Sequence, residues 1–176
     1  MDKAYQELMG LAIGQLYKGG AFLMTGKEEK NPMTIGWCQF GRIWNETCCT
    51  VYVRPCRYSH GLLERDGVFT VCFPTDDSMK QALGFCGTKS GRDVDKCKEL
   101  NLTTIPNAAG GIDALAGNFI RVECKVMGKA EFEKGLVEHD PALRDRYYNP
   151  DNRVGEDSDL HTVYYGKILF MEQYGA

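Results

Sequence analysis

Apolar residues recur at helical spacing near the start of the chain and at strand spacing over most of the remainder. The first pattern predicts a helix over residues 2–18, which Gly19-Gly20 ends. Its apolar positions are Tyr5, Leu8, Ala12 and Leu16. The period then changes, because residues 21–25 form a short apolar run typical of a strand, and a charged turn follows at 26–30.

Further strands are indicated by β-branched and aromatic residues and by alternation. Residues 34–44 and 48–54 predict a hairpin, with Asn45-Glu46-Thr47 as its turn. Residues 118–132 alternate between two sets of side chains with a period of two. The remaining predicted strands are residues 68–73 and 162–174. About six strands at this spacing favour a small antiparallel barrel over a doubly wound sheet.

Short helices are expected between these strands. They are predicted at residues 57–65, 76–85, 92–101 and 141–148, with a loop at 107–111. No internal repeat or linker divides the chain. We therefore expect one domain over residues 1–176, with an N-terminal helix over 1–18 and a surface arm over 140–160.

Composition narrows the class of protein. The 176 residues are 43% hydrophobic and 26% charged, which is ordinary globular usage and excludes disorder as a description of the whole chain. The net charge of −3 and the lack of a basic stripe disfavour nucleic acid as a partner. The polar start resembles no signal peptide, and no segment reaches the length of a membrane helix. We expect a soluble, cytoplasmic protein without a membrane partner.

The eight cysteines predict buried, reduced thiols. No C-x-x-C pair occurs, and His60, His139 and His161 lie far apart, so the spacing argues against a metal site. A disulfide framework is not expected without a secretory signal. The adjacent Cys48 and Cys49 point to opposite faces of a strand and are interpreted as structural.

Three segments carry residues suited to a ligand. The first is residues 53–60, where Arg54, Cys56, Arg57 and Ser59 stand between a strand and a helix. A helix N-terminus beside two arginines suits a phosphate, although a plain strand-to-helix turn with solvated arginines is an equal reading.

The other two segments are weaker when each is taken alone. In residues 86–96, small and hydroxylic residues would let a ligand approach, but Ser90 and Asp93 also match a helix capping box. Residues 31–37 could present donors to a heterocycle, or could be a turn that opens a strand at Thr34. Trp37 and Trp44 are interpreted as core or interface residues.

Taken together, these segments resemble the flavin reductase-like, FMN-binding split-barrel family, and most of all its flavoredoxin-type branch. The motifs are N-x-M-T-I-G-W, G-R-I-W, V-R-P-x-R-Y-S-H, C-G-T-x-S-G-R-D-x-D-K and H-x-x-Y-x-G-x-I, in that order. In this chain they occupy residues 31–37, 41–44, 53–60, 86–96 and 161–168, and the match spans about residues 20–170. The resemblance implies a mainly β, antiparallel, Greek-key-like split barrel with inserted short helices that forms a homodimer.

The resemblance also implies roles for individual residues. Asn31, Met33, Thr34, Ile35 and Gly36 would line the isoalloxazine ring of FMN. Residues expected to hold the phosphate or cover the ribityl chain are Arg54, Cys56, Arg57, Ser59, Thr88, Ser90, Gly91, Arg92 and Lys96. Thr34 and His161 would act at the reactive edge of the ring or beside an incoming nicotinamide. Because Cys56 stands where the pattern commonly has Ser, and a thiol is a weak donor, we expect weaker retention of FMN.

The implied function is that of an FMN-binding oxidoreductase. It would pass electrons from NAD(P)H or another reduced carrier to a flavin or a downstream acceptor, with the cofactor supplying the difficult chemistry. One alternative is a flavoredoxin-like electron carrier that holds FMN tightly and does not react with NAD(P)H. Another is a flavin-binding module without turnover. The N-x-M-T and S-G-R-D motifs argue against a relative of pyridoxamine-phosphate oxidase.

Overall fold

The structure, a computed structural model, describes residues 3–132, 140–148 and 160–175. Its helices are α1 (Lys3–Lys18), α2 (Tyr58–Asp66), the 3₁₀ turn η1 (Asp77–Met79), α3 (Lys80–Thr88), α4 (Lys96–Glu99) and α5 (Pro141–Tyr147). Its strands are β1 (Ala21–Thr25), β2 (Asn31–Ile35), β3 (Cys38–Ile43), β4 (Glu46–Val53), β5 (Val68–Pro74), β6 (Thr104–Ile105), β7 (Ala114–Leu115), β8 (Phe119–Glu131) and β9 (Thr162–Tyr174).

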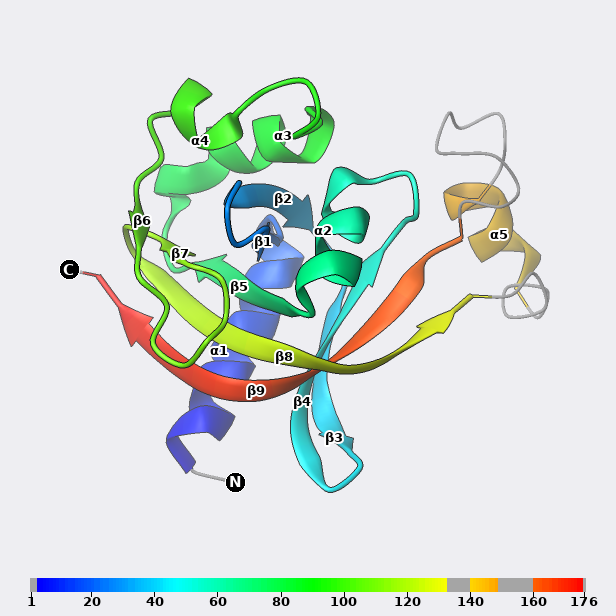
Figure 1. The fold of residues 1–176 in the computed structure, drawn as a ribbon. Helices are drawn as coiled ribbons and strands as arrows, with labels where there is room; N and C mark the ends of the chain where they lie inside the picture. The colour runs from blue at the N-terminus through cyan, green and yellow to red at the C-terminus, as the bar shows by residue number, and fades with distance from the viewer. Residues whose placement is uncertain (1–2, 133–139, 149–159, 176) are drawn as a thin grey trace.

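Seven of these strands form one antiparallel sheet in the order β2-β1-β5-β8-β9-β4-β3. The 13-residue strands β8 and β9 pair along their length and bend through two register shifts, near Glu123 and near Val126. Figure 1 shows this pair curving across the molecule, with α1 behind it and α3 and α4 near β2. The mainly antiparallel β architecture with short inserted helices is confirmed.

The strands near the middle of the sheet are covered on both faces. Leu23 and Val71 join a core that includes Met9 and Ala12 of α1, whereas Phe22 packs on the other face into a second core with α3 and residues 112–119. A strand buried on both faces has no polar side to alternate with. This explains why 21–25 is a continuous apolar run rather than an alternating one.

Two segment predictions were wrong. Residues 34–44 are not one strand, since Thr34 and Ile35 end β2, which pairs with β1, and β3 begins only at Cys38. The hairpin turn accordingly falls at Trp44-Asn45 rather than at residues 45–47. The helix expected at 92–101 is the four-residue α4, and Asp95 caps it by accepting from the Lys98 N–H. Ser90 and Asp93 instead belong to a preceding turn.

Smaller differences concern two other helices. Residues 76–85 divide into η1 and α3, and α3 continues to Thr88. Most of the predicted surface arm at 140–160 lies outside the described residues. Its first part is α5, as the sequence predicts. Within the described residues, no helix is both long and apolar enough to cross a membrane.

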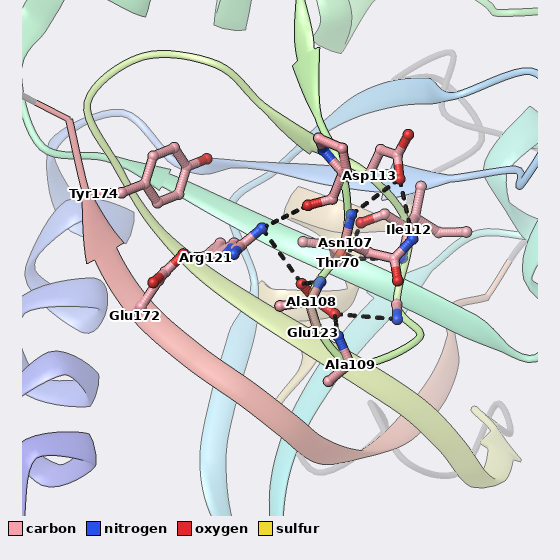
Figure 2. A network of polar contacts seen from close by, with 12 residues as sticks. Thr70, Asn107, Ala108, Ala109, Ile112, Asp113, Arg121, Glu123, Glu172 and Tyr174 are labelled. Carbon is pink, nitrogen blue, oxygen red and sulfur yellow. Dashed lines mark hydrogen bonds and ion pairs between the residues drawn. The ribbon is translucent and has the colours of Figure 1, made fainter.

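A buried polar network fastens the loop before β7 to the sheet (Figure 2). The Glu123 side chain has 0% exposure, and its carboxylate accepts from the backbone N–H groups of Ala108, Ala109 and Gly111 at 2.7, 2.8 and 3.2 Å. Arg121 lies two residues earlier on the same face of β8. Its guanidinium is 2.6 Å from Glu172 and 3.5 Å from Glu123, and it donates to the Pro106 carbonyl. The positive charge of Arg121 is therefore paired with the negative charges of Glu172 and Glu123.

Candidate functional site

One cavity of about 340 Å³ collects the sequence motifs that lie far apart along the chain. It opens where β2 ends, β4 ends and β9 begins. Its lining residues are Met33, Thr34, Ile35, Gly36, Trp37, Tyr52, Val53, Arg54, Cys56, Arg57, Gly87 and His161. We call it the main cavity. It brings together eight residues named from the sequence: Met33, Thr34, Ile35, Gly36, Arg54, Cys56, Arg57 and His161.

Arginines form one end of the main cavity. Arg57 is the N-cap residue of α2, but its side chain makes no capping hydrogen bond to the helix. The side chain reaches across the cavity instead. It donates from Nε to the Met33 sulfur at 3.3 Å and from a terminal nitrogen to the Gly87 carbonyl at 2.9 Å. Within the described residues it has no carboxylate partner. A guanidinium has five N–H donors, so donors remain for an anion.

Arg54 is the second arginine and is 9% exposed. It donates to the Tyr147 carbonyl at 2.6 Å, and its guanidinium carbon lies 5.0 Å from the centre of the Tyr148 ring. The end of α5 is thereby held against Arg54, which directly follows β4. A contact between residues 93 positions apart cannot be read from sequence spacing.

Aromatic side chains form another wall of the main cavity. The rings of Trp37 and His161 lie 4.5 Å apart at 37°, and Tyr147 meets Trp37 edge-on at 5.2 Å. The Tyr148 hydroxyl is 2.7 Å from His161 Nδ1. Burial raises the pKa of Tyr148, with Arg54 acting in the opposite direction, so the phenol keeps its proton at neutral pH. His161 is thus held in place by two aromatic neighbours.

A second cavity of about 270 Å³ holds three other predicted residues, Asn31, Gly91 and Lys96. Asn31 is 5% exposed, and its amide nitrogen donates to Ser59 Oγ at 2.9 Å, while its Oδ1 has no hydrogen-bond partner in the described residues. A Cβ at Gly91 would clash with that oxygen and with the Tyr58 ring, so glycine suits this position. Ser59 is buried behind Asn31.

Lys96 is 3% exposed, and it points into the protein rather than toward solvent. Its ammonium donates to the carbonyls of Pro32 at 2.7 Å and Cys86 at 3.4 Å, which ties β2 to α3. Burial lowers the pKa of Lys96, and the nearby charge of Arg57 lowers it further. The positive charges of Lys96 and Arg57 therefore repel each other at the arginine end of the main cavity.

The remaining predicted residues lie outside both cavities. The Thr88 hydroxyl donates to carbonyls within α3, and Ser90 Oγ accepts from the Arg92 N–H. Arg92 donates to the Cys56 carbonyl at 2.8 Å and lies over the Tyr58 ring, so it borders the main cavity from outside. Thr34 does line the main cavity, but its hydroxyl donates to the Leu83 carbonyl at 2.6 Å.

Sequence reasoning missed several lining residues. Trp37 was interpreted as core or interface, although it follows directly after Gly36 in the first motif and lines the main cavity. Tyr52 lies on β4, two positions before Arg54, which directly follows that strand, and this spacing could have revealed it. Gly87 sits inside the C-G-T motif. Tyr147 and Tyr148 are not lining residues, but they contact the lining residues Trp37 and His161, and no local signal in the sequence indicates this.

The cysteines form no disulfide in the structure, and each of the eight is a free thiol. Burial raises the pKa of Cys72 to about 12 and of Cys86 to about 11, as expected for protonated structural thiols. Among the described residues, no group of three or more His, Cys, Asp or Glu side chains is arranged to hold a metal ion.

Comparison with known proteins defines the class. The family model described as "Flavin reductase like domain" matches residues 14–172, and the chain belongs to this family. A curated relative from Archaeoglobus fulgidus, an uncharacterised protein, is 27% identical over 109 residues. That match covers 62% of this chain and 60% of the relative's length.

Solved structures with the same fold come from several organisms. A flavoredoxin from Methanosarcina acetivorans is 19% identical and has a TM-score of 0.62, covering 89% of this chain and 67% of that one. An FMN-binding protein from Thermus thermophilus is 20% identical with a TM-score of 0.63, covering 86% and 69%. An NADH:FAD oxidoreductase from Streptomyces globisporus C-1027 is 15% identical with a TM-score of 0.64, covering 89% and 75%.

Proposed function

We propose that the main cavity binds FMN and that the protein is an oxidoreductase. It would pass electrons from NAD(P)H or another reduced carrier to the flavin or to a downstream acceptor. The observation that carries this proposal is the composition of one cavity. Arg57, which has no carboxylate partner among the described residues, stands at one end, and an aromatic wall and the end of β2 stand beside it.

The arginine end suits the phosphate of FMN. Arg57 has unused donors there, and Cys56 and Arg57 stand where the uncapped N-terminus of α2 begins. A phosphate anion would also offset the repulsion between Arg57 and Lys96. Arg54 would contribute charge from the other side. Because Lys96 is committed to two carbonyls, we propose that it supports β2 and acts on the phosphate through its charge.

The strand end suits the isoalloxazine ring. Met33, Thr34, Ile35 and Gly36 present an edge of β2 and the following bend to the cavity. A Cβ at Gly36 would meet nothing within 4 Å, so no protein atom fills the space in front of that backbone. Bound FMN would supply the redox chemistry, and these residues would position it and exclude water. Direct contacts of Asn31, Ser59, Thr88, Ser90, Gly91 and Arg92 with FMN stay predictions.

The proposal also concerns the electron donor and the electron acceptor. Proteins of the same fold are described as an NADH:FAD oxidoreductase and as a flavoredoxin, which supports both a nicotinamide-dependent reductase and an electron carrier. His161 and Thr34 are proposed as the residues closest to the reacting edge. Hydride transfer needs a positioned cofactor and little acid–base help, so the described lining residues could support it by holding the ring in place.

An anaerobic absorbance experiment tests the proposal directly. The purified protein is loaded with FMN, excess FMN is removed, and the spectrum is recorded before and after NADH or NADPH. Bleaching by one nicotinamide is the expected result for a reductase. Bleaching only by dithionite would favour the carrier. Failure to retain or bind FMN at micromolar concentration would contradict the assignment of the main cavity.

Two further expectations belong to this proposal. We propose a homodimer, on the strength of the family resemblance, and sedimentation equilibrium of the purified protein tests it. We also propose a cytoplasmic location, which eight free thiols support because a reducing compartment keeps cysteines unpaired.

A further inference from the structure

A third cavity, of about 370 Å³, adjoins the main cavity and differs from it in chemistry. Ile13, Leu16 and Tyr17 of α1 form one side. Trp37, Cys38 and Tyr52 form the other. We call it the apolar cavity. Its volume lies within the range of about 300–1,000 Å³ that is usual for small-molecule sites.

Among the described residues, the lining of the apolar cavity carries no charge. None of these lining residues is Lys, Arg, Asp, Glu or His, whereas Arg54, Arg57 and His161 contribute to the main cavity. The Cys38 thiol adds no charge, because its contact with Cys49 and burial both raise its pKa well above the usual value. Burying an unpaired ion against such a surface is costly, so an uncharged ligand is favoured.

The shape and polarity of the wall suit a planar ring that carries a carbonyl group. Trp37 and Tyr52 meet edge-on, with ring centres 6.3 Å apart at 78°, and so present both an aromatic face and an aromatic edge. The Tyr52 hydroxyl donates to Gln39 Oε1 at 2.8 Å. This fixes the Gln39 amide with its nitrogen available as a donor to a ligand oxygen.

The two cavities share a wall. Gly36, Trp37 and Tyr52 line both of them, and at Gly36 the wall is backbone alone. A ring in the apolar cavity would therefore lie beside a molecule in the main cavity. If that molecule is FMN, as proposed above, the ligand of the apolar cavity would lie next to the flavin, close enough to exchange electrons with it.

We propose that the apolar cavity binds an uncharged, carbonyl-bearing ring compound of the quinone class, and that this compound is the electron acceptor of FMN in the main cavity. Reduced FMN would lose two electrons and two protons and so be oxidised, and the quinone would take them up and become the hydroquinone. The binding itself does not depend on FMN. The role of the ligand as a redox partner rests on the proposed function.

Binding is tested with tetramethyl-1,4-benzoquinone, whose substituted ring cannot add to Cys38. The chain has two tryptophans, so a Trp44→Phe background leaves Trp37 as the only one. In this background, FMN-free protein is titrated with the quinone, and Trp37 emission is followed. Saturable quenching is expected. Equilibrium dialysis with and without FMN then shows whether the quinone stays bound when the main cavity is filled, as we expect.

Two variants of α1 give a matched comparison. Ile13 and Leu11 are both exposed on this helix, at 41% and 55%, but only Ile13 lines the apolar cavity. Ile13→Glu should raise the quinone dissociation constant at least tenfold, and Leu11→Glu should change it less than twofold. FMN affinity should be the same in both.

Several outcomes would overturn the inference. These are no saturable quenching, equal effects of the two variants, or displacement of the quinone by FMN. A fourth is a wild-type dimer that binds no quinone and that Ile13→Glu converts to a monomer, since a second copy would then fill the cavity. Loss of FMN binding with intact quinone binding would instead contradict only the proposed function.

Discussion

The main cavity and the Arg121–Glu123 network both contain buried charge, but they are built in opposite ways. In the network, Arg121 is 7% exposed and meets the carboxylates of Glu172 and Glu123, and Glu123 in turn accepts from three backbone N–H groups. Figure 2 shows these side chains turned toward one another. Beside the main cavity, Arg57, Arg92 and Lys96 reach only carbonyl oxygens, a sulfur atom and an aromatic ring within the described chain.

This difference separates structural charge from functional charge. A charged group whose partners are all in the protein stabilises one arrangement of the chain. A cation that makes no ion pair with a carboxylate, as Arg57 does not within the described residues, can still attract an anion from outside. The comparison therefore predicts that substitutions in the network lower stability and leave FMN affinity unchanged. Substitutions at the main cavity should instead lower FMN affinity and change stability little.

The largest expected effect is that of Glu123→Ala. It would leave the N–H groups of Ala108, Ala109 and Gly111 without their acceptor. It would also remove one of the two carboxylates that balance the charge of Arg121. Breaking a buried pair on one side costs about 3–5 kcal/mol, so the free energy of unfolding should fall by that amount. Urea denaturation at neutral pH measures it. Glu131→Ala, on the exposed end of the same strand, is the control and should change stability by less than about 0.5 kcal/mol. A similar cost for both variants would contradict the structural role of Glu123.

The next effect is that of Arg57→Ala on FMN binding. Hydrogen bonds from a charged group contribute about 1.5–3 kcal/mol, which corresponds to a rise of roughly 10–100-fold in the FMN dissociation constant. Titration by flavin absorbance or fluorescence measures this change. Arg42→Ala, on the exposed β3 strand outside the main cavity, removes the same charge and should leave the affinity within twofold. Equal losses would mean that net charge, and not the cavity, sets the affinity.

Tyr148→Phe should have a smaller effect, because the hydroxyl holds His161 rather than a ligand. Loss of this neutral hydrogen bond should lower the free energy of unfolding by about 0.5–1.5 kcal/mol and change FMN affinity less than threefold. Thermal denaturation and FMN titration check the two values. Tyr17→Phe, at a 90% exposed side chain, is the control. A tenfold loss of FMN affinity in Tyr148→Phe would show that the hydroxyl itself contacts the cofactor.

The sequence predicts the helices and strands around the main cavity better than it predicts the contacts between them. Patterning identified α1 and β8 from the regular spacing of their residues, β1 from its continuous apolar run, and β5 and β9 from their β-branched and aromatic residues. It failed at β2, where Asn31-Pro32 has the composition of a turn. Proline is tolerated there because β2 is an edge strand, so the missing N–H removes no bond of the sheet.

Long-range contacts set the remaining limit. Alternation placed Arg121 and Glu123 on one face of a strand, but not the loop of residues 106–113 that buries them. The motifs likewise named Arg54 and His161, but the packing of Tyr147 and Tyr148 against these two residues includes a contact across 93 positions. Such contacts follow from packing of the whole chain and leave no local periodicity.

The smallest effect concerns the ion pair that joins the two regions. Asp113, in the loop held by Glu123, lies 2.7 Å from Lys30, directly before β2. The hydrogen bond from Lys30 lowers the pKa of Asp113 below its usual value, and Asn107 adds to this. A carboxyl whose pKa is depressed in the folded state contributes stability above its unfolded pKa of about 3.9, and this is lost as the pH falls through the folded value.

Asp113→Asn should therefore lower the free energy of unfolding by less than about 1 kcal/mol at pH 7, since the pair is partly exposed. The difference from wild type should disappear at a pH below the folded pKa of Asp113, where the carboxyl is protonated in both the folded and the unfolded state. Urea denaturation at both pH values measures this, with Asp77→Asn, an 84% exposed carboxylate, as control. FMN affinity should stay within twofold at pH 7. A larger loss would mean that the loop positions β2 for the cofactor, and the two regions would then act as one unit.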